Sequence, residues 1–315
     1  MGKIAYLFPG QGSQKVGMAK DFFDADEAVR QRLNALDQRL DTPLSQIMFE
    51  GPDDLLKQTQ NTQPAILTHS ILAYEALMAA GAPKPDVVAG HSLGEYSALV
   101  ASGALDLESA ATAVQLRGRL MQDAVPSGHG AMAAVLGLEP KAIDTLCRDL
   151  SADGASNYVA VANYNGAGQT VVAGNAATVE RALPLFKEAG AKRALPLPVS
   201  APFHCELMAP VQVPLRSHLE GLIWNAPATP WVANVDAALH TAQEDILDLL
   251  IQQVTAPVRF TQMVAALLAQ GVDTFVEIGP GKVLTGILKR EAKGCQLLNV
   301  SQESDVGVVA NALSA

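Results

Sequence analysis

The sequence contains little cysteine. Its three cysteines, Cys147, Cys205 and Cys295, are odd in number and widely separated, and none forms a Cys-x-x-Cys pair. This pattern favours neither a disulfide framework nor a zinc site. It predicts a protein without a bound metal ion, in a reducing, cytoplasmic setting.

Charged residues and long apolar runs are also scarce. Charged residues make up 17% of the 315 residues, below the roughly 25% usual for soluble domains. The net charge of −10 offers no overall basic surface for nucleic acid. No apolar run reaches the roughly 18 residues that span a bilayer, and the first residues lack the apolar stretch of a signal peptide. We therefore expect neither nucleic-acid nor membrane partners. Because 49% of the residues are hydrophobic, we also expect a large packed core.

Short apolar runs alternate with helical patterns along most of the chain. This alternation predicts an α/β fold, with a mostly parallel sheet covered by helices on both faces. The predicted strands are 4–8, 86–90, 231–235, 274–278 and 296–300, and the predicted helices are 62–80, 93–101, 106–123, 204–220, 244–253, 258–270 and 282–291.

The middle of the chain has a different pattern. After a hinge-like segment at 127–130, the order of elements is β-α-β-β-α-β, which is typical of a ferredoxin-like unit. We therefore expect a small ferredoxin-like subdomain, 128–198, inserted into a large subdomain formed by 1–127 and 199–315. The strands of the insertion are 131–138, 158–163, 169–174 and 193–199, and its helices are 139–150 and 176–189.

The segment Gly90-His91-Ser92-Leu93-Gly94 fits the pattern G-x-S-x-G between a predicted strand and a predicted helix. Such a sharp turn pushes the serine hydroxyl out of the sheet, and the following helix offers backbone N–H groups to an oxyanion. The motif predicts Ser92 as a nucleophile in an α/β-hydrolase-like subdomain. The alternative is an ordinary strand-to-helix turn in which Ser92 caps the helix.

A serine nucleophile needs a base, and the sequence offers six histidines, at positions 69, 91, 129, 204, 218 and 240. His91 adjoins Ser92, but in such a turn its side chain points away from the serine hydroxyl. His204 follows a predicted strand end and a proline-containing turn, which favours it slightly over a histidine without a role. No Asp or Glu stands plainly at a strand end of the large subdomain, so a carbonyl group is an alternative partner for the imidazole.

Several motifs occur together in one order: FPGQGSQ at 8–14, GHSLGEY at 90–96, QLRGR at 115–119, NGAGQ at 165–169, Phe203-His204, and EIGPGK at 277–282. With them the chain closely resembles the malonyl-CoA:acyl-carrier-protein transacylases of type II fatty acid synthesis. These enzymes are related to the acyltransferase domains of polyketide synthases. The resemblance covers nearly the whole chain and includes the inserted subdomain.

The resemblance implies a ping-pong acyl transfer without a bound cofactor. Ser92 would take malonyl from malonyl-CoA, and the phosphopantetheine thiol of acyl carrier protein would then receive it. His204 would be the base and then the acid. The resemblance also assigns the oxyanion hole to the backbone N–H groups of Gln11 and Leu93, and the orientation of His204 to the main-chain carbonyl of Gln253. It places three further residues near the acyl pocket: His91, Asn165 and Phe203.

Arg117 is the residue expected to select the substrate. Malonyl carries a free carboxylate, and a planar guanidinium binds a carboxylate through two parallel hydrogen bonds. The alternative is a solvent-exposed helix arginine, which is how we interpret Arg119. Cys205 follows His204 directly, but neighbours in sequence give no support to a cysteine nucleophile.

Other functions remain open at this stage. They are a serine thioesterase or hydrolase on the same turn, a trans-acting acyltransferase for polyketide synthesis or malonate decarboxylation, and a non-enzymatic carrier-docking scaffold. The resemblance also implies a monomer. Because the net charge of −10 would repel an acidic carrier protein, we expect a local basic docking patch. Its candidates are Lys187, Lys192 and Arg193 on the insertion, and Lys289, Arg290 and Lys293 near the C-terminus.

Overall fold

The computed structural model describes residues 2–152, 154, 157–166, 168–199 and 201–314. Two residues of the predicted motif segments lie outside the described residues: Ala167 in NGAGQ and Ser200, four residues before His204. Within the described residues no helix is long and apolar enough to cross a membrane.

Sheet A has the strand order β10-β9-β1-β2-β7-β8. The pairs among the first five strands are parallel, and β8 is antiparallel to β7. The predicted mostly parallel sheet is therefore confirmed. Its strands are β1 (Lys3–Phe8), β2 (Val87–Gly90), β7 (Trp231–Val232), β8 (Leu239–His240), β9 (Val272–Ile278) and β10 (Gln296–Val300).

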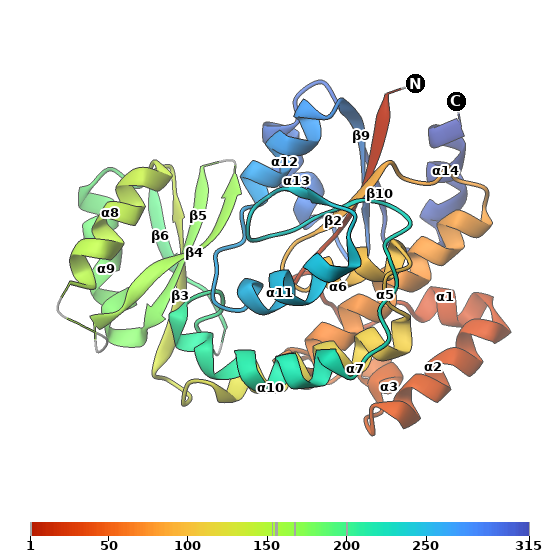
Figure 1. Cartoon of the computed structure of the whole chain (residues 1–315), viewed down its shortest axis with the longest axis horizontal. Helices are drawn as coiled ribbons and strands as arrows, with labels where there is room; N and C mark the ends of the chain where they lie inside the picture. The colour runs from red at the N-terminus through yellow and green to blue at the C-terminus, as the bar shows by residue number, and fades with distance from the viewer. Residues whose placement is uncertain (1, 153, 155–156, 167, 200, 315) are drawn as a thin grey trace.

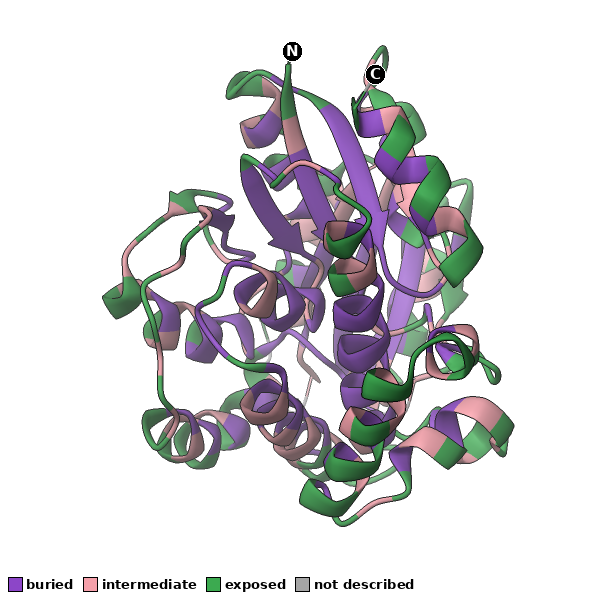
Figure 2. Ribbon diagram, turned by 90° about the vertical axis from the view of Figure 1, so that its right-hand side faces the viewer, coloured by how far each residue is buried: buried purple, intermediate pink, exposed green. Residues whose placement is uncertain are grey.

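Both faces of sheet A are covered, because alternate residues of β1 pack into different cores. Tyr6 and Phe8 pack into a core with α5 (Thr59–Ala79) and α7 (Leu107–Asp123). Ala5 and Leu7 pack into a second core with α12 (Phe260–Ala269) and α13 (Val283–Glu291). Figure 1 shows these helices on opposite sides of the sheet, and Figure 2 shows its strands buried. The large part of the molecule thus has three layers, with sheet A between two layers of helices.

Sheet B is small, antiparallel and separate from sheet A, with the order β4-β5-β3-β6. This is the order of a ferredoxin-like β-α-β-β-α-β unit, and Figure 1 shows α8 and α9 packed beside it. The predicted small antiparallel unit is confirmed. Its elements are β3 (Gly130–Leu136), α8 (Pro140–Leu150), β4 (Val159–Gly166), β5 (Gln169–Asn175), α9 (Ala176–Glu188) and β6 (Arg193–Pro196).

The segment around His204 differs from the prediction. β6 ends at Pro196 and belongs to sheet B, so His204 does not follow a strand of the parallel sheet. It also does not begin a helix, because its φ is 58°. A short 3-10 helix (Glu206–Met208) follows, and then α10 (Ala209–Glu220). His204 therefore lies in the connection that returns from the small sheet to the larger part.

Other boundaries also differ. The predicted strand 231–235 is only two residues long, because Ala233 and Asn234 turn back toward β8. Predicted helices 93–101 and 244–253 correspond to α6 (Gly94–Ala101) and α11 (Gln243–Gln253). Among the described residues, five helices were not predicted: α1 (Lys20–Ala25), α2 (Glu27–Arg39), α3 (Leu44–Glu50), α4 (Asp53–Leu56) and α14 (Glu303–Ser314).

Candidate active site

The turn between β2 and α6 is tight and strained. Ser92 has a φ of 53°, a left-handed conformation that costs a non-glycine residue on the order of 1–3 kcal/mol. A Cβ on Gly90 would lie 1.9 Å from the carbonyl of Gly94, and a Cβ on Gly94 would lie 2.0 Å from the oxygen of Phe8. Glycine is thus required at both positions. Leu93 is the N-cap of α6, and Ser92 Oγ is engaged with His204 and Arg117, so the helix-cap alternative is wrong.

The structure brings Ser92 and His204 together although 112 positions separate them. The serine Oγ lies 2.6 Å from His204 Nε2, and His204 Nδ1 lies 2.9 Å from the main-chain oxygen of Gln253. A carbonyl oxygen accepts hydrogen bonds only, which places the proton of the neutral ring on Nδ1. Nε2 is then free to accept the serine proton. No carboxylate is needed to orient this imidazole.

His204 is held in the neutral form. Burial lowers the pKa of its imidazole to about 3, and the positive charge of Arg117 acts in the same direction. The carbonyl of Gln253 opposes this shift but does not outweigh it. A neutral imidazole is the form that accepts a proton from a hydroxyl.

Arg117 lies in α7 with only 1% of its surface exposed. One Nη donates to Gln63 Oε1 at 2.8 Å; the other donates to Gln253 Oε1 at 2.9 Å and to Ser92 Oγ at 3.2 Å. Among the described residues it forms no salt bridge, and its Nε has no hydrogen-bond partner. A buried cation with neutral partners and an unused N–H is suited to receive an anionic group. The alternative of a solvent-exposed arginine is wrong.

These side chains surround a cavity of about 110 Å³. Since a single water needs about 10–15 Å³ measured in this way, the cavity has room for a small acyl group. Its lining contains Gln11, Gln63, His91, Ser92, Leu93, Arg117, Met121, Met132, Asn163, Leu197, Val199, Phe203 and His204.

His91 lines this cavity and is paired with Asn165, which was expected near the acyl pocket but is not among the lining residues. His91 Nε2 donates to Asn165 Oδ1 at 2.8 Å, and Asn165 Nδ2 donates to Gln169 Oε1 at 3.1 Å. The His91 ring also packs against Phe260, at 5.6 Å between centroids. The side chain of His91 is therefore engaged with strand β4 and not with the serine hydroxyl.

Sequence reasoning missed Gln63, Asn163, Glu95 and Asn234. Gln63 and Asn163 line the cavity, while Glu95 and Asn234 lie beneath it, with 1% and 0% of their surfaces exposed. Glu95 offered a signal, because it is a carboxylate within the apolar run that follows Ser92. The other three are neutral amides, whose placement depends on contacts distant in sequence.

Alternatives to the serine nucleophile find no support in the geometry. Burial raises the pKa of the Cys205 thiol to about 12, and its Sγ donates to the oxygen of Pro202. Among the described residues, no cluster of three or more His, Cys, Asp or Glu side chains could hold a metal ion.

Comparison with known proteins gives the family. The family model for the acyl transferase domain matches residues 5–311. A malonyl CoA-acyl carrier protein transacylase of Bacillus subtilis is 44% identical, over 97% of this chain and 96% of that protein. One of Staphylococcus aureus is 42% identical over 97% of this chain and 98% of that protein. The chain belongs to the malonyl-CoA:acyl-carrier-protein transacylase family.

Solved structures of family members superpose closely. An acyl carrier protein S-malonyltransferase from Vibrio cholerae has a TM-score of 0.93 at 46% identity, covering 98% of this chain and 99% of that one. A malonyl-transacylase in complex with its type II PKS acyl-carrier protein has a TM-score of 0.94 at 41% identity, with the same coverage.

Proposed function

We propose that this protein transfers malonyl from malonyl-CoA to the phosphopantetheine thiol of acyl carrier protein, through a malonyl-serine on Ser92. The observation that carries the proposal is the position of Arg117. This buried guanidinium, which has no carboxylate partner among the described residues, lies 3.2 Å from a serine oxygen that is paired with a neutral histidine. A short acyl group with a terminal carboxylate can bind Arg117 through that carboxylate and reach Ser92 with its carbonyl carbon at the same time.

In the first half-reaction, Ser92 Oγ attacks the thioester carbonyl carbon while its proton passes to His204 Nε2. The negative charge on the carbonyl oxygen is received by the backbone N–H groups of Gln11 and Leu93, which both line the cavity. The carbon–sulfur bond then breaks, and the proton on Nε2 passes to the leaving sulfur of CoA. The Gln253 carbonyl stabilises the cationic imidazole that exists between the two proton transfers.

The second half-reaction repeats these steps with a different thiol. The carrier-protein thiol gives its proton to His204 Nε2, and its sulfur attacks the malonyl carbonyl. The bond to Ser92 Oγ breaks, and that oxygen recovers the proton. Arg117 binds the malonyl carboxylate throughout, while His91 and Phe203 form part of the wall around the acyl group. Asn165 acts through its hydrogen bond to His91.

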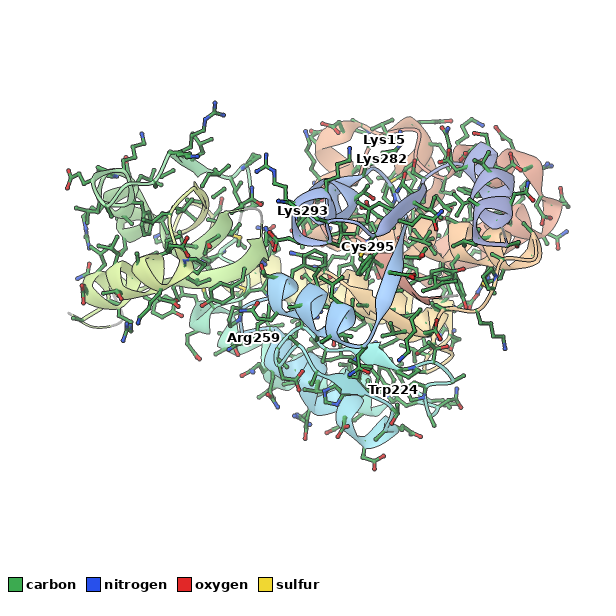
Figure 3. The ribbon with its side chains drawn as sticks, turned by 90° about the horizontal axis from the view of Figure 1, so that it is seen from above. Lys15, Trp224, Arg259, Lys282, Lys293 and Cys295 are labelled. Carbon is green, nitrogen blue, oxygen red and sulfur yellow. The ribbon has the colours of Figure 1, made fainter. Side chains whose placement is uncertain are left out.

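We assign carrier-protein docking to a basic surface beside the β4–β5 hairpin. The side chain of Lys192 would block a Cβ on Gly137, and the side chain of Glu291 at the end of α13 would block a Cβ on Gly166. Gly137 also donates through its N–H to the Gly168 oxygen. Lys192 and the end of α13 thus both lie beside the β4–β5 hairpin, and Lys293 is seen at the border between the two parts of the molecule (Figure 3). The surface consists of Lys187, Lys192, Arg193, Lys289, Arg290 and Lys293.

The remaining parts of the proposal follow the family. We assign the chemistry to a discontinuous large subdomain, 1–127 and 199–315, and carrier contacts to it and the inserted subdomain, 128–198. A monomeric, cytoplasmic enzyme without a resident cofactor stays a prediction.

Product analysis tests the proposed function. The protein is mixed with malonyl-CoA, with and without phosphopantetheinylated carrier protein, and malonyl-carrier protein and free malonate are quantified. We expect malonyl-carrier protein as the main product. Release of malonate at the same rate with and without carrier protein would instead identify a thioesterase, and carrier binding without acylation would identify a scaffold.

A further inference from the structure

Asn234 spans the nucleophile turn from beneath. Its Oδ1 accepts a hydrogen bond from the backbone N–H of Ser92 at 2.7 Å, and its Nδ2 donates to the backbone oxygen of Gly90, also at 2.7 Å. A donor on one side and an acceptor on the other fix the orientation of the amide. One side chain therefore joins the residues on either side of His91.

Asn234 is itself immobilised through its backbone. Its N–H donates to Glu95 Oε2 at 3.1 Å, and its carbonyl accepts from the N–H of Arg259 at 3.1 Å. None of its surface is exposed, so solvent offers no replacement partner. Asn234 is thus held in place by α6 on one side and by the segment before α12 on the other.

The same carboxylate connects Asn234 to the rest of the site. Glu95 Oε2 also accepts from Gln253 Nε2 at 2.7 Å, and that Nε2 donates to the oxygen of Ser92 at 3.0 Å. The N–H and the carbonyl of Ser92 are consequently both bound by side chains that Glu95 holds in place. Gln253 in turn accepts from Arg117 through Oε1 and from His204 through its backbone oxygen.

We propose that Asn234 is the positioning residue of the nucleophile: its amide holds Ser92 in the left-handed conformation that points Oγ at His204. The amide also occupies the N–H of Ser92, which leaves the next N–H along the chain, that of Leu93, to face the oxyanion. Asn234 touches no substrate and acts only through the turn. This inference rests on the proposed role of Ser92 as the nucleophile.

The variant Asn234→Ala removes both hydrogen bonds and leaves a buried N–H and a buried carbonyl without partners. A fluorophosphonate probe that modifies activated serines measures the result without requiring malonyl-CoA or carrier protein. We expect the rate constant for modification of the folded protein to fall at least about tenfold. The acylation rates with malonyl-CoA and acetyl-CoA are expected to fall by the same factor, because positioning of Oγ precedes any recognition of the acyl group.

Asn61→Ala is the matched control. Asn61 is also buried, and its Nδ2 donates to the backbone oxygen of Leu55 at 2.9 Å, away from the turn. Its loss is expected to lower the melting temperature while the folded protein keeps the wild-type labelling rate. If Asn234→Ala does not fold, Asn234→Asp decides. It sets a carboxylate oxygen against the Gly90 oxygen where the amide donated, so the turn loses one of its two attachments and slower labelling is still expected.

The outcomes separate this inference from the proposed function. Wild-type labelling by the probe with slow labelling of Asn234→Ala or Asn234→Asp supports the positioning role. Labelling of the folded variant at the wild-type rate would overturn it and leave a purely structural residue. Absence of probe labelling on Ser92 in the wild-type protein would instead count against the nucleophile itself.

Discussion

Arg117 Nη2 lies 3.2 Å from Ser92 Oγ. The guanidinium that we expect to bind the substrate carboxylate is therefore adjacent to the serine oxygen that we expect to attack the thioester. This distance limits the acyl group to a short one. The hydrogen bonds of Arg117 go to Gln63, Gln253 and Ser92, all at the site. These bonds explain why an arginine is tolerated on the mainly apolar, buried face of α7.

Replacing Arg117 with Ala is expected to reduce malonyl transfer much more than acetyl transfer. The carboxylate of malonyl loses a buried charged partner, which we expect to lower kcat/KM for malonyl-CoA at least about a hundredfold. Acetyl-CoA has no carboxylate and loses less. Steady-state rates with both donors measure the ratio, and Arg119→Ala, on the same helix, serves as the control with an unchanged ratio. Equal losses with the two donors would contradict the carboxylate role.

In the variant Glu95→Gln, which removes the titration of the buried Glu95, the rate of Ser92 acylation is expected to stay level from pH 8 to pH 5. The pKa of His204 is lowered to about 3, so the ring is neutral throughout this range and loses its base function only below it. An ordinary histidine, with a pKa of about 6.5, would be mostly protonated at pH 5. Single-turnover acylation by malonyl-CoA at a series of pH values measures this.

A second group titrates near neutrality and must be separated from His204. Burial raises the pKa of Glu95 to about 7, against the hydrogen bonds from Gln253 and Asn234. The profile is therefore recorded for Glu95→Gln. A fall centred near pH 6.5 that persists in this variant would show that His204 titrates as an ordinary histidine, which would contradict its lowered pKa.

Gly94→Ala is expected to prevent correct formation of the turn. The new methyl group would lie 2.0 Å from the oxygen of Phe8 in β1, which is backbone and cannot move without displacing sheet A. Soluble yield and the melting temperature measure the loss. Gly286→Ala in α13 is the control, since nothing lies within 4 Å of its new methyl group. There we expect a gain of about 0.5–1 kcal/mol from helix propensity. A Gly94→Ala protein with wild-type stability would contradict the packing of this turn.

Charge reversal at Lys192 and Lys289 is expected to raise the KM for carrier protein while leaving Ser92 acylation by malonyl-CoA unchanged. The enzyme has a net charge of −10, so an acidic partner depends on local positive charge. Lys84→Glu, at an exposed site just before β2, controls for the overall change in charge. The effect should diminish at high salt. An equal effect from Lys84→Glu would show that only net charge matters.

Patterns of residues close in sequence predicted part of the fold and of the site, but not all of either. The alternation of apolar residues predicted the strands that pair beside β1, and the G-x-S-x-G turn predicted the strain that the φ of Ser92 confirms. Both depend on residues that are close in sequence. His204 was chosen for a reason that the structure does not support, because its segment leaves sheet B and not sheet A.

Residues that act through distant contacts had no pattern of their own. Asn234 and Gln253 are 142 and 161 positions from Ser92, and each contacts it through a single hydrogen bond to its backbone. An amide in a loop or at a helix end is common, so nothing local distinguishes these two. Helices α1, α3 and α4 were missed for another reason: they have six, seven and four residues, and Pro43 and Pro52 separate the last two from what precedes them, so no helical period extends far enough to be recognised. The longer helix α2 was not recognised either.

Direct localisation of the acyl group tests the central claim. The protein is mixed with malonyl-CoA alone, digested and mapped by mass spectrometry, and the sample is then chased with phosphopantetheinylated carrier protein. We predict malonyl on the Ser92 peptide, absent from Ser92→Ala, which disappears during the chase as malonyl-carrier protein forms in equal amount. Malonyl-carrier protein formed by Ser92→Ala at the wild-type rate, or an adduct on another residue, would contradict the account.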